Sequence, residues 1–132
     1  MKKLFDDVSE ACSKVVTESY STSFTLATKM LDRSIRQDIY NIYGFVRFAD
    51  EIVDSFHDFN KQELLNLFES DLKKSIKDKI SLNPILNSFQ KTFNKYEIDY
   101  KLVNSFLKSM KWDLNKKQYL KKGEFDEYVY GS

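Results

Sequence analysis

The sequence predicts an all-α protein, and three observations support this prediction. Only three glycines and one proline occur among the 132 residues, which leaves long stretches uninterrupted for helices. No segment alternates apolar and polar residues as a half-buried strand does, and neither Asn-Gly nor Asp-Gly occurs as a hairpin turn. The sequence also contains no repeat, linker or low-complexity tract. We therefore expect residues 1–132 to form a single all-α unit.

Turn and capping residues divide the first half of the chain into three helices. The first helix is expected over about residues 5–19, because the hydroxyl residues of YSTSF, at 20–24, favour a turn over a helix interior. A short helix then continues to about Met30. Asp32 is a suitable N-cap for the next helix, which we expect to extend over about residues 33–56.

Two further helices are predicted from their N-terminal signals. Asn60 is followed three residues later by Glu63, which resembles a capping box and begins a helix that ends near Ile80. Asn83 and Pro84 combine an N-cap with a proline at the first helical position, an arrangement that is common at helix starts. These signals place two helices in the middle of the chain.

The last part of the chain is expected to hold one more helix and a short final segment. The helix that begins at Pro84 should end near Tyr96, and Asp99 is a suitable cap for the next helix. Gly123 indicates a break before EFDEYVYGS, at 124–132. That final segment is aromatic, whereas chain ends are more often polar. We therefore expect the chain to be a truncated part of a larger domain.

Composition narrows the class of protein. Hydrophobic residues make up 42% and charged residues 31%, a balance typical of folded soluble proteins. The net charge of +1 gives no reason to expect a nucleic-acid partner. Cys12 is the only cysteine, so a disulfide framework is excluded. The N-terminus lacks a signal-peptide core, and no apolar run approaches the length of a membrane span. A cytoplasmic location is expected.

The helix predicted over residues 33–56 is apolar almost all round, apart from one narrow polar stripe. Helices of this kind are usually buried, and a buried carboxylate needs a partner or a bound cation. At 100° per residue, the polar side chains of the stripe lie within about 60° of Arg47. They are Arg36, Tyr40, Tyr43, Asp50, Glu51 and Asp54.

Two interpretations of this stripe are open. In the first, the stripe faces solvent and carries Arg47–Asp50 and Arg47–Glu51 ion pairs, each of which stabilises the helix by only tenths of a kcal/mol. In the second, it binds a divalent cation, because its three carboxylates outnumber the one nearby arginine. Asp50 and Asp54 project from adjacent turns of one face, and Mg²⁺ commonly combines one or two carboxylates with substrate phosphate oxygens.

Three segments together resemble the squalene/phytoene synthase family of head-to-head prenyl transferases. YSTSF resembles the family's Ser-x-Ser-Phe segment, and YGFVRFADEIVD, at 43–54, resembles its first aspartate-rich motif. EFDEYVYGS resembles the start of a Tyr-x-Tyr-x-x-Ala-Gly segment, in a form most like bacterial phytoene synthases. The resemblance implies the N-terminal part of the isoprenoid synthase fold, in which helices surround a central cavity.

The resemblance also implies roles for individual residues. Asp50 and Asp54 would bind Mg²⁺, and Glu51 occupies the second acidic position of the same metal motif. The other matched residues would meet the substrate. Tyr43, Arg47, Ser21 and Ser23 would contact its diphosphate. Phe24 would line the pocket, and Asp113 would lie near the centre of the cavity. Tyr128 would lie by the reacting allylic carbons.

The chain departs from the family pattern in several places. Glu51 replaces the commoner aspartate, and Tyr20 stands where many members have histidine. The second Asp-x-x-x-Asp motif of the family and the Ala-Gly that follows Tyr-x-Tyr are not in the chain. The resemblance therefore covers the N-terminal half of a synthase, and we expect the chain alone to have little or no synthase activity.

The implied reaction is the Mg²⁺-dependent condensation of two geranylgeranyl diphosphates, through a cyclopropyl diphosphate, to phytoene in carotenoid biosynthesis. Alternatives are a squalene or dehydrosqualene synthase using farnesyl diphosphate, a prenyl-lipid-binding remnant, and a helical interaction module without catalysis. A basic patch near the end of the sequence indicates either a solvated face or attraction to anionic lipid or diphosphate. Attraction to lipid would allow peripheral association with the inner membrane face. Its members are Lys116, Lys117, Lys121 and Lys122.

Overall fold

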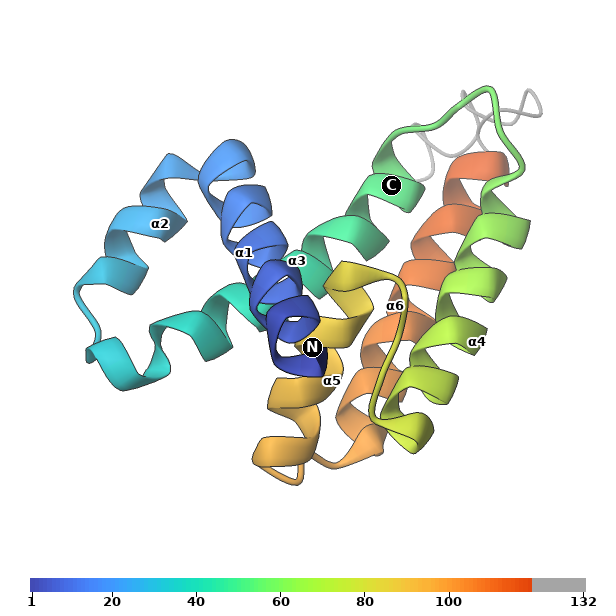
Figure 1. The fold of residues 1–132 in the computed structure, drawn as a ribbon. Helices are drawn as coiled ribbons and strands as arrows, with labels where there is room; N and C mark the ends of the chain where they lie inside the picture. The colour runs from blue at the N-terminus through green and yellow to red at the C-terminus, as the bar shows by residue number, and fades with distance from the viewer. Residues whose placement is uncertain (120–132) are drawn as a thin grey trace.

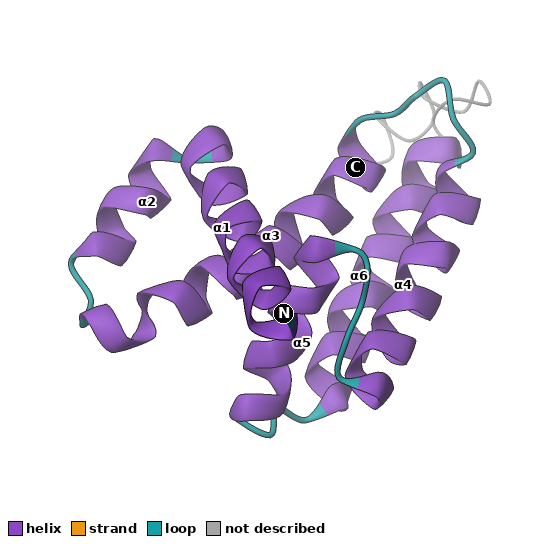
Figure 2. Ribbon diagram, viewed as in Figure 1, coloured by secondary structure: helices purple, strands orange, loops and turns teal. Residues whose placement is uncertain are grey.

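The computed structural model describes residues 1–119, which form six α-helices and no strand (Figure 2). The all-α prediction is therefore confirmed. The expected break at Gly123 and the segment 124–132, which includes Tyr128, lie outside the described residues. The helices are α1 (Lys2–Tyr20), α2 (Thr22–Lys29), α3 (Arg33–Asp54), α4 (Lys61–Asp78), α5 (Pro84–Lys95) and α6 (Tyr100–Tyr119).

Most helix starts agree with their sequence signals. The side chains of the predicted caps each accept a hydrogen bond from a backbone N–H in the first turn of their helix; these caps are Asp32, Asn60, Asn83 and Asp99. Three bounds differ from the prediction by two residues or more, and one of them is the end of α4, at Asp78 rather than near Ile80. The first helix begins at Lys2 rather than near residue 5. The third ends at Asp54 rather than at Phe56, because Ser55 is extended and Phe56 has a φ of 53°.

The helices are arranged around α3 and α5 (Figure 1). Helix α1 packs across both of them, while α4 and α6 lie side by side against their other side. Helix α2 and the first turns of α3 project away from this core, at the left of the view in Figure 1. The polar stripe of α3 therefore begins in the projecting arm and continues into the body of the protein.

Phe45 is the centre of the hydrophobic core. Its side chain is buried, and its ring stacks on Phe89 of α5 at 4.2 Å and on Phe68 of α4 at 5.5 Å between centroids. Phe106 of α6 adds a tilted contact at 5.7 Å. One aromatic side chain of α3 thus joins the three helices α4, α5 and α6.

Helix α1 packs through small polar side chains. Ser9, Ser13 and Thr17 are fully buried, and the Ser13 hydroxyl is hydrogen-bonded to that of Ser88 on α5. A Cβ atom placed on Gly44 would lie 3.1 Å from Ser13 Oγ, which is too close for easy accommodation. The glycine therefore allows α1 to approach α3 closely.

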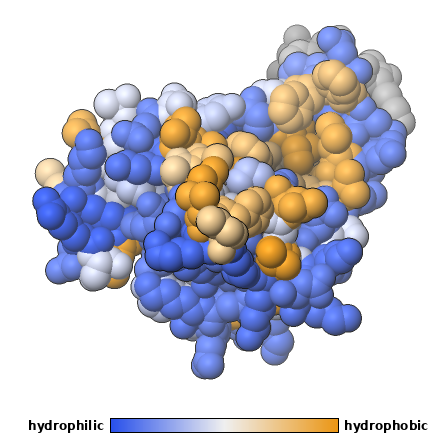
Figure 3. Space-filling view, viewed as in Figure 1, coloured by the Kyte–Doolittle hydropathy of each residue, from blue (hydrophilic) through white to orange (hydrophobic). Residues whose placement is uncertain are grey.

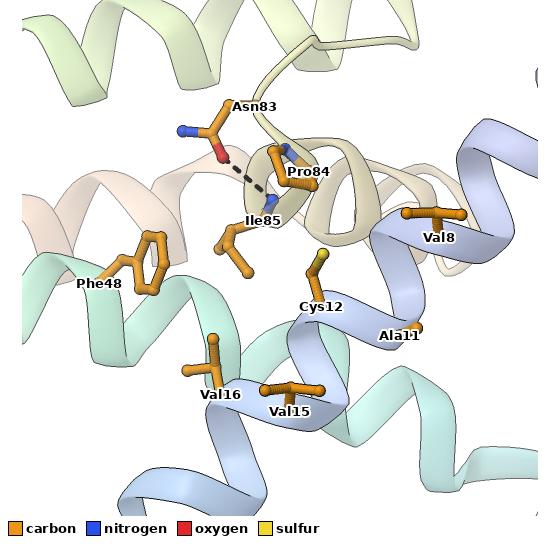
Figure 4. Close-up of a pocket in the computed structure, with 9 residues that line it drawn as sticks. All are labelled: Val8, Ala11, Cys12, Val15, Val16, Phe48, Asn83, Pro84 and Ile85. Carbon is orange, nitrogen blue, oxygen red and sulfur yellow. Dashed lines mark hydrogen bonds between the residues drawn. The ribbon is translucent and has the colours of Figure 1, made fainter.

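The apolar side of α1 faces an open groove. The groove has a volume of about 710 Å³, and Figure 3 shows apolar side chains gathered across this face of the protein. In Figure 4 the groove lies between α1, α3 and the start of α5. None of the residues that line it belongs to the predicted site; they are Val8, Ala11, Cys12, Val15, Val16, Phe48, Asn83, Pro84 and Ile85.

Asp38 joins α3 to the end of α5. Its carboxylate accepts hydrogen bonds from the Thr92 hydroxyl at 3.1 Å, the Lys95 ammonium at 2.9 Å and the Tyr96 hydroxyl at 2.6 Å. Burial opposes the charge of Asp38, but these bonds outweigh it and hold the pKa of the carboxyl below its ordinary value.

Replacing Asp38 with asparagine is expected to lower the free energy of unfolding at neutral pH by about 2 kcal/mol, because the three hydrogen bonds to its charged carboxylate weaken. The lowered pKa means that this stabilisation is full above the unfolded-state pKa and is lost as pH falls through the folded-state pKa. Urea unfolding of both proteins from neutral to acid pH checks this. A difference that stays constant in acid would show that the charge is not its source.

Within residues 1–119, no helix combines the length and the apolar composition that crossing a membrane requires.

Candidate functional site

The middle of α3 carries a compact group of charged side chains. Arg47 Nη2 lies 2.8 Å from Glu51 Oε2, and Arg47 Nη1 lies 3.2 Å from Asp50 Oδ2. Both ion pairs that the helical spacing suggested are thus present. The side chains of Arg47 and Glu51 are largely buried, with 22% and 19% of their surface exposed, whereas that of Asp50 is 40% exposed.

The segment at residues 20–24 packs onto this part of α3. The Tyr20 ring lies against the Arg47 guanidinium, with 4.7 Å between its centroid and Cζ. Phe24 stacks on Tyr43 at 4.7 Å between centroids, with an interplanar angle of 26°. The two segments that the sequence singled out, about 20 residues apart, therefore meet on one surface.

Ser21 and Ser23 lie at the turn that brings these two segments together. Ser21 is the one non-helical residue between α1 and α2, and its hydroxyl accepts a hydrogen bond from the Phe24 N–H at 3.0 Å. This N-cap bond begins α2 and positions Phe24 against α3. As a hydroxyl, Ser21 can still donate a hydrogen bond. Ser23 is exposed on the first turn of α2.

Three side chains donate hydrogen bonds to Glu51. Ser55 donates to its Oε1 at 2.5 Å, Arg47 donates to its Oε2, and the Tyr20 hydroxyl also donates to the carboxylate. The bond from Ser55, followed by that from Arg47, holds the pKa of Glu51 below its ordinary value despite partial burial. The hydrogen bond between Tyr20 and Glu51 raises the pKa of the Tyr20 hydroxyl.

Arg47 stays charged in this setting. Burial opposes its charge, but the hydrogen bond to Glu51 and the negative charges of Glu51 and Asp50 outweigh that effect and raise its pKa. Its Nε is buried and has no hydrogen-bond partner within the described part of the chain. Such a donor is costly to leave unpaired, so this nitrogen could bind an anionic group.

Asp50 and Asp54 are the carboxylates that the sequence suggested for a cation. They lie on successive turns of α3, and Asp54 is exposed. Across residues 1–119, no group of three or more His, Cys, Asp or Glu side chains gathers in a way that could hold a metal ion. Two carboxylates still fit Mg²⁺, which usually takes one or two of them and completes its six ligands with water and phosphate oxygens.

The remaining predicted residues lie elsewhere. Asp113 is half-buried on α6, outside the contacts that join residues 20–24 to α3. Tyr128 lies outside the described residues. In the basic patch, Lys116 is exposed near the end of α6, and the other side chains of that patch are not described.

Sequence reasoning missed two contributors to the group. Ser55 was given no role, although its i,i+4 spacing from Glu51 was a usable signal. Tyr20 was noted only as a departure from the family pattern. Its contact with Arg47 depends on how α1 crosses α3, which no local pattern in the sequence encodes.

Comparisons with known proteins point to one family. The family model for squalene/phytoene synthase matches residues 17–132, a range that contains both 20–24 and 43–54. A phytoene synthase from Arthrospira platensis is 26% identical to the chain over 125 residues, which cover 94% of the chain. The chain spans 40% of the length of that curated relative. No solved structure matches the chain.

Proposed function

The chain belongs to the squalene/phytoene synthase family, and on this basis we propose that it binds a prenyl diphosphate with Mg²⁺ against the polar stripe of α3. The full reaction proposed for this site is the head-to-head condensation of two geranylgeranyl diphosphates to phytoene. The similarity to a phytoene synthase favours this substrate. Farnesyl diphosphate, with squalene or dehydrosqualene as product, is the alternative.

One observation carries the proposal, namely the packing of residues 20–24 onto α3. It brings Tyr20 to Arg47 and Phe24 to Tyr43, and Ser21 and Ser23 lie within the same short segment. A diphosphate needs hydrogen-bond donors and positive charge, and Arg and Ser supply both. Asp50 lies on the same surface, where a carboxylate would repel a diphosphate unless a cation lay between them.

The residues present fit a bound Mg²⁺ ion, and Asp50 and Asp54 would hold it. When bound, Mg²⁺ would supply charge neutralisation for the departing diphosphate. Arg47 would hold the same diphosphate through its N–H groups, and Ser21 would donate its hydroxyl hydrogen to it. Their joint effect would be to fix the leaving group in one orientation.

The aromatic pair Phe24 and Tyr43 would perform a different task. These rings stack on each other, and Tyr43 lies one helical turn before Arg47 on α3. The faces of aromatic rings carry negative partial charge. A wall of this kind excludes water from an allylic cation and tolerates its positive charge through cation–π attraction. Polar residues would thus meet the diphosphate, while the rings would meet the prenyl carbons.

Binding of a non-reactive thiolo analogue of geranylgeranyl diphosphate to the chain tests the proposal. Calorimetric titration with Mg²⁺ is expected to show binding that becomes at least about tenfold weaker when EDTA removes the metal. Geranylgeraniol, which has the same prenyl chain without the diphosphate, is the matched control. Equal binding of the alcohol would replace the proposal with apolar lipid binding, and no binding of either compound would favour an interaction module.

A further inference from the structure

Glu51 and Asp50 are adjacent carboxylates on α3 that differ in their surroundings. Both pair with Arg47, but the Glu51 contact is shorter, at 2.8 Å against 3.2 Å, and its side chain is about half as exposed. Glu51 also accepts hydrogen bonds from Ser55 and Tyr20. Glu51 therefore has both oxygens engaged inside the protein, whereas Asp50 is the carboxylate that solvent reaches.

Arg47 is held from two directions. Glu51 fixes one end of the guanidinium through Nη2, and the Tyr20 ring covers its face. Two anchors of this kind define both the position and the plane of the group, and a fixed plane is what makes arginine selective for phosphate oxygens. The buried Nε, which lacks a partner within residues 1–119, keeps one donor of this group unused.

A cation at Asp50 would compete directly with Arg47 for that carboxylate. If Asp50 turned toward the cation, Arg47 would lose its longer contact, at 3.2 Å, and keep the one to Glu51. If Glu51 also bound the cation, it would have to give up its bonds from Ser55 and Tyr20. If the cation took the Glu51 oxygen that holds Arg47, Arg47 would lose both carboxylates when a diphosphate binds.

We propose that Glu51 and Tyr20 are positioning residues that keep Arg47 oriented toward a diphosphate, and that Glu51 is not a metal ligand. This inference rests on the proposed function and divides the acidic motif between two tasks. Asp50 and Asp54 face the cation, while Glu51 faces inward to the arginine. Tyr20 takes part through both its hydroxyl, which meets Glu51, and its ring, which covers Arg47.

The first test measures Arg47 itself and needs no ligand. The chain has three arginines, so its NMR spectrum contains three Nε–Hε signals, and exposed Arg33 is an internal mobile reference. Arg47 is expected to be rigid in the wild type and mobile in Glu51→Gln, which weakens the bond to Nη2, and in Tyr20→Leu, which removes both the ring and the hydroxyl. Amide spectra identify any variant that fails to fold. The inference is overturned if Arg47 stays rigid in both folded variants, or if it is already mobile in the wild type.

The second test separates metal binding from diphosphate binding. Mn²⁺ binding is followed by electron paramagnetic resonance, and binding of inorganic diphosphate with Mg²⁺ by calorimetry. Glu51→Gln and Tyr20→Leu are expected to weaken diphosphate binding by about tenfold and to leave Mn²⁺ affinity unchanged, whereas Asp50→Asn lowers Mn²⁺ affinity. Equal loss of Mn²⁺ affinity in Glu51→Gln and Asp50→Asn makes Glu51 a ligand and overturns the inference.

These two tests also distinguish the inference from the proposed function. Failure of the wild-type chain to bind diphosphate overturns the proposed function. The NMR signals of Arg47 then still show whether Tyr20 and Glu51 hold its side chain in place. Diphosphate binding that is equally strong in the wild type and in both variants supports the proposed function and overturns the positioning role.

Discussion

Replacing both Asp50 and Asp54 with asparagine is expected to abolish Mg²⁺-dependent binding of a prenyl diphosphate analogue. The double variant keeps the size and polarity of the side chains but removes two negative charges from adjacent turns of α3. Mg²⁺ binds carboxylates and phosphates strongly and neutral amides weakly. We expect affinity for the analogue to fall by at least about tenfold, to the level that the wild type shows in EDTA.

A second double variant, Asp58→Asn with Asp71→Asn, is the matched control. Both of these aspartates are exposed and lie outside the stripe, so their loss changes the net charge of the chain by the same amount. Calorimetric titration of the analogue with Mg²⁺ should therefore give wild-type affinity for the control. Comparable weakening in both double variants would mean that overall charge governs binding, and the metal role of Asp50 and Asp54 would be wrong.

Helix positions were predictable because the signals that set them are local. Asp32 and Asn83 are short polar residues placed where a helix needs acceptors for its first N–H groups, and each makes that bond in the structure. The end of α3 was predicted less well. Its stop depends on the backbone of Ser55 and Phe56, and neither residue is a strong helix breaker by type.

The packing of α1 was not predictable from its apolar pattern. The general rule would bury Val8 and Val15, yet these side chains are exposed and Ser13 is buried instead. The cause lies on another helix, where Gly44 leaves room for α1 to approach closely through small hydroxyl residues. The apolar pattern of one helix does not show which surface of another helix has room for that helix to pack against it.

The two interpretations of the α3 stripe turned out not to exclude each other. The ion pairs of Arg47 are present, as helical spacing alone suggests. Asp50 is nevertheless 40% exposed on its side chain, so pairing with Arg47 has not removed it from solvent. What the sequence could not provide is the part of the difference between Asp50 and Glu51 that comes from Tyr20 at the far end of α1.

Replacing Phe45 with alanine is expected to cause the largest loss of stability. This ring is only 2% exposed, and it contacts aromatic rings of α4, α5 and α6. Removing it would leave a cavity where four helices meet, at a cost of about 3–5 kcal/mol. Because small domains are stable by only about 5–15 kcal/mol, this is a large part of the total.

The matched control for this prediction is Phe59→Ala, since Phe59 lies in the loop before α4 and is 68% exposed. Its replacement should change the free energy of unfolding by less than about 0.5 kcal/mol. Urea unfolding followed by circular dichroism measures both variants, and a shift in midpoint with an unchanged slope identifies a change in stability alone. A loss for Phe45→Ala no larger than for Phe59→Ala would contradict the packing of α4, α5 and α6 around this ring. Phe45 and Arg47 lie on the same helix. That result would therefore also mean that the Phe45 ring does not fix α3, and with it Arg47, in the core.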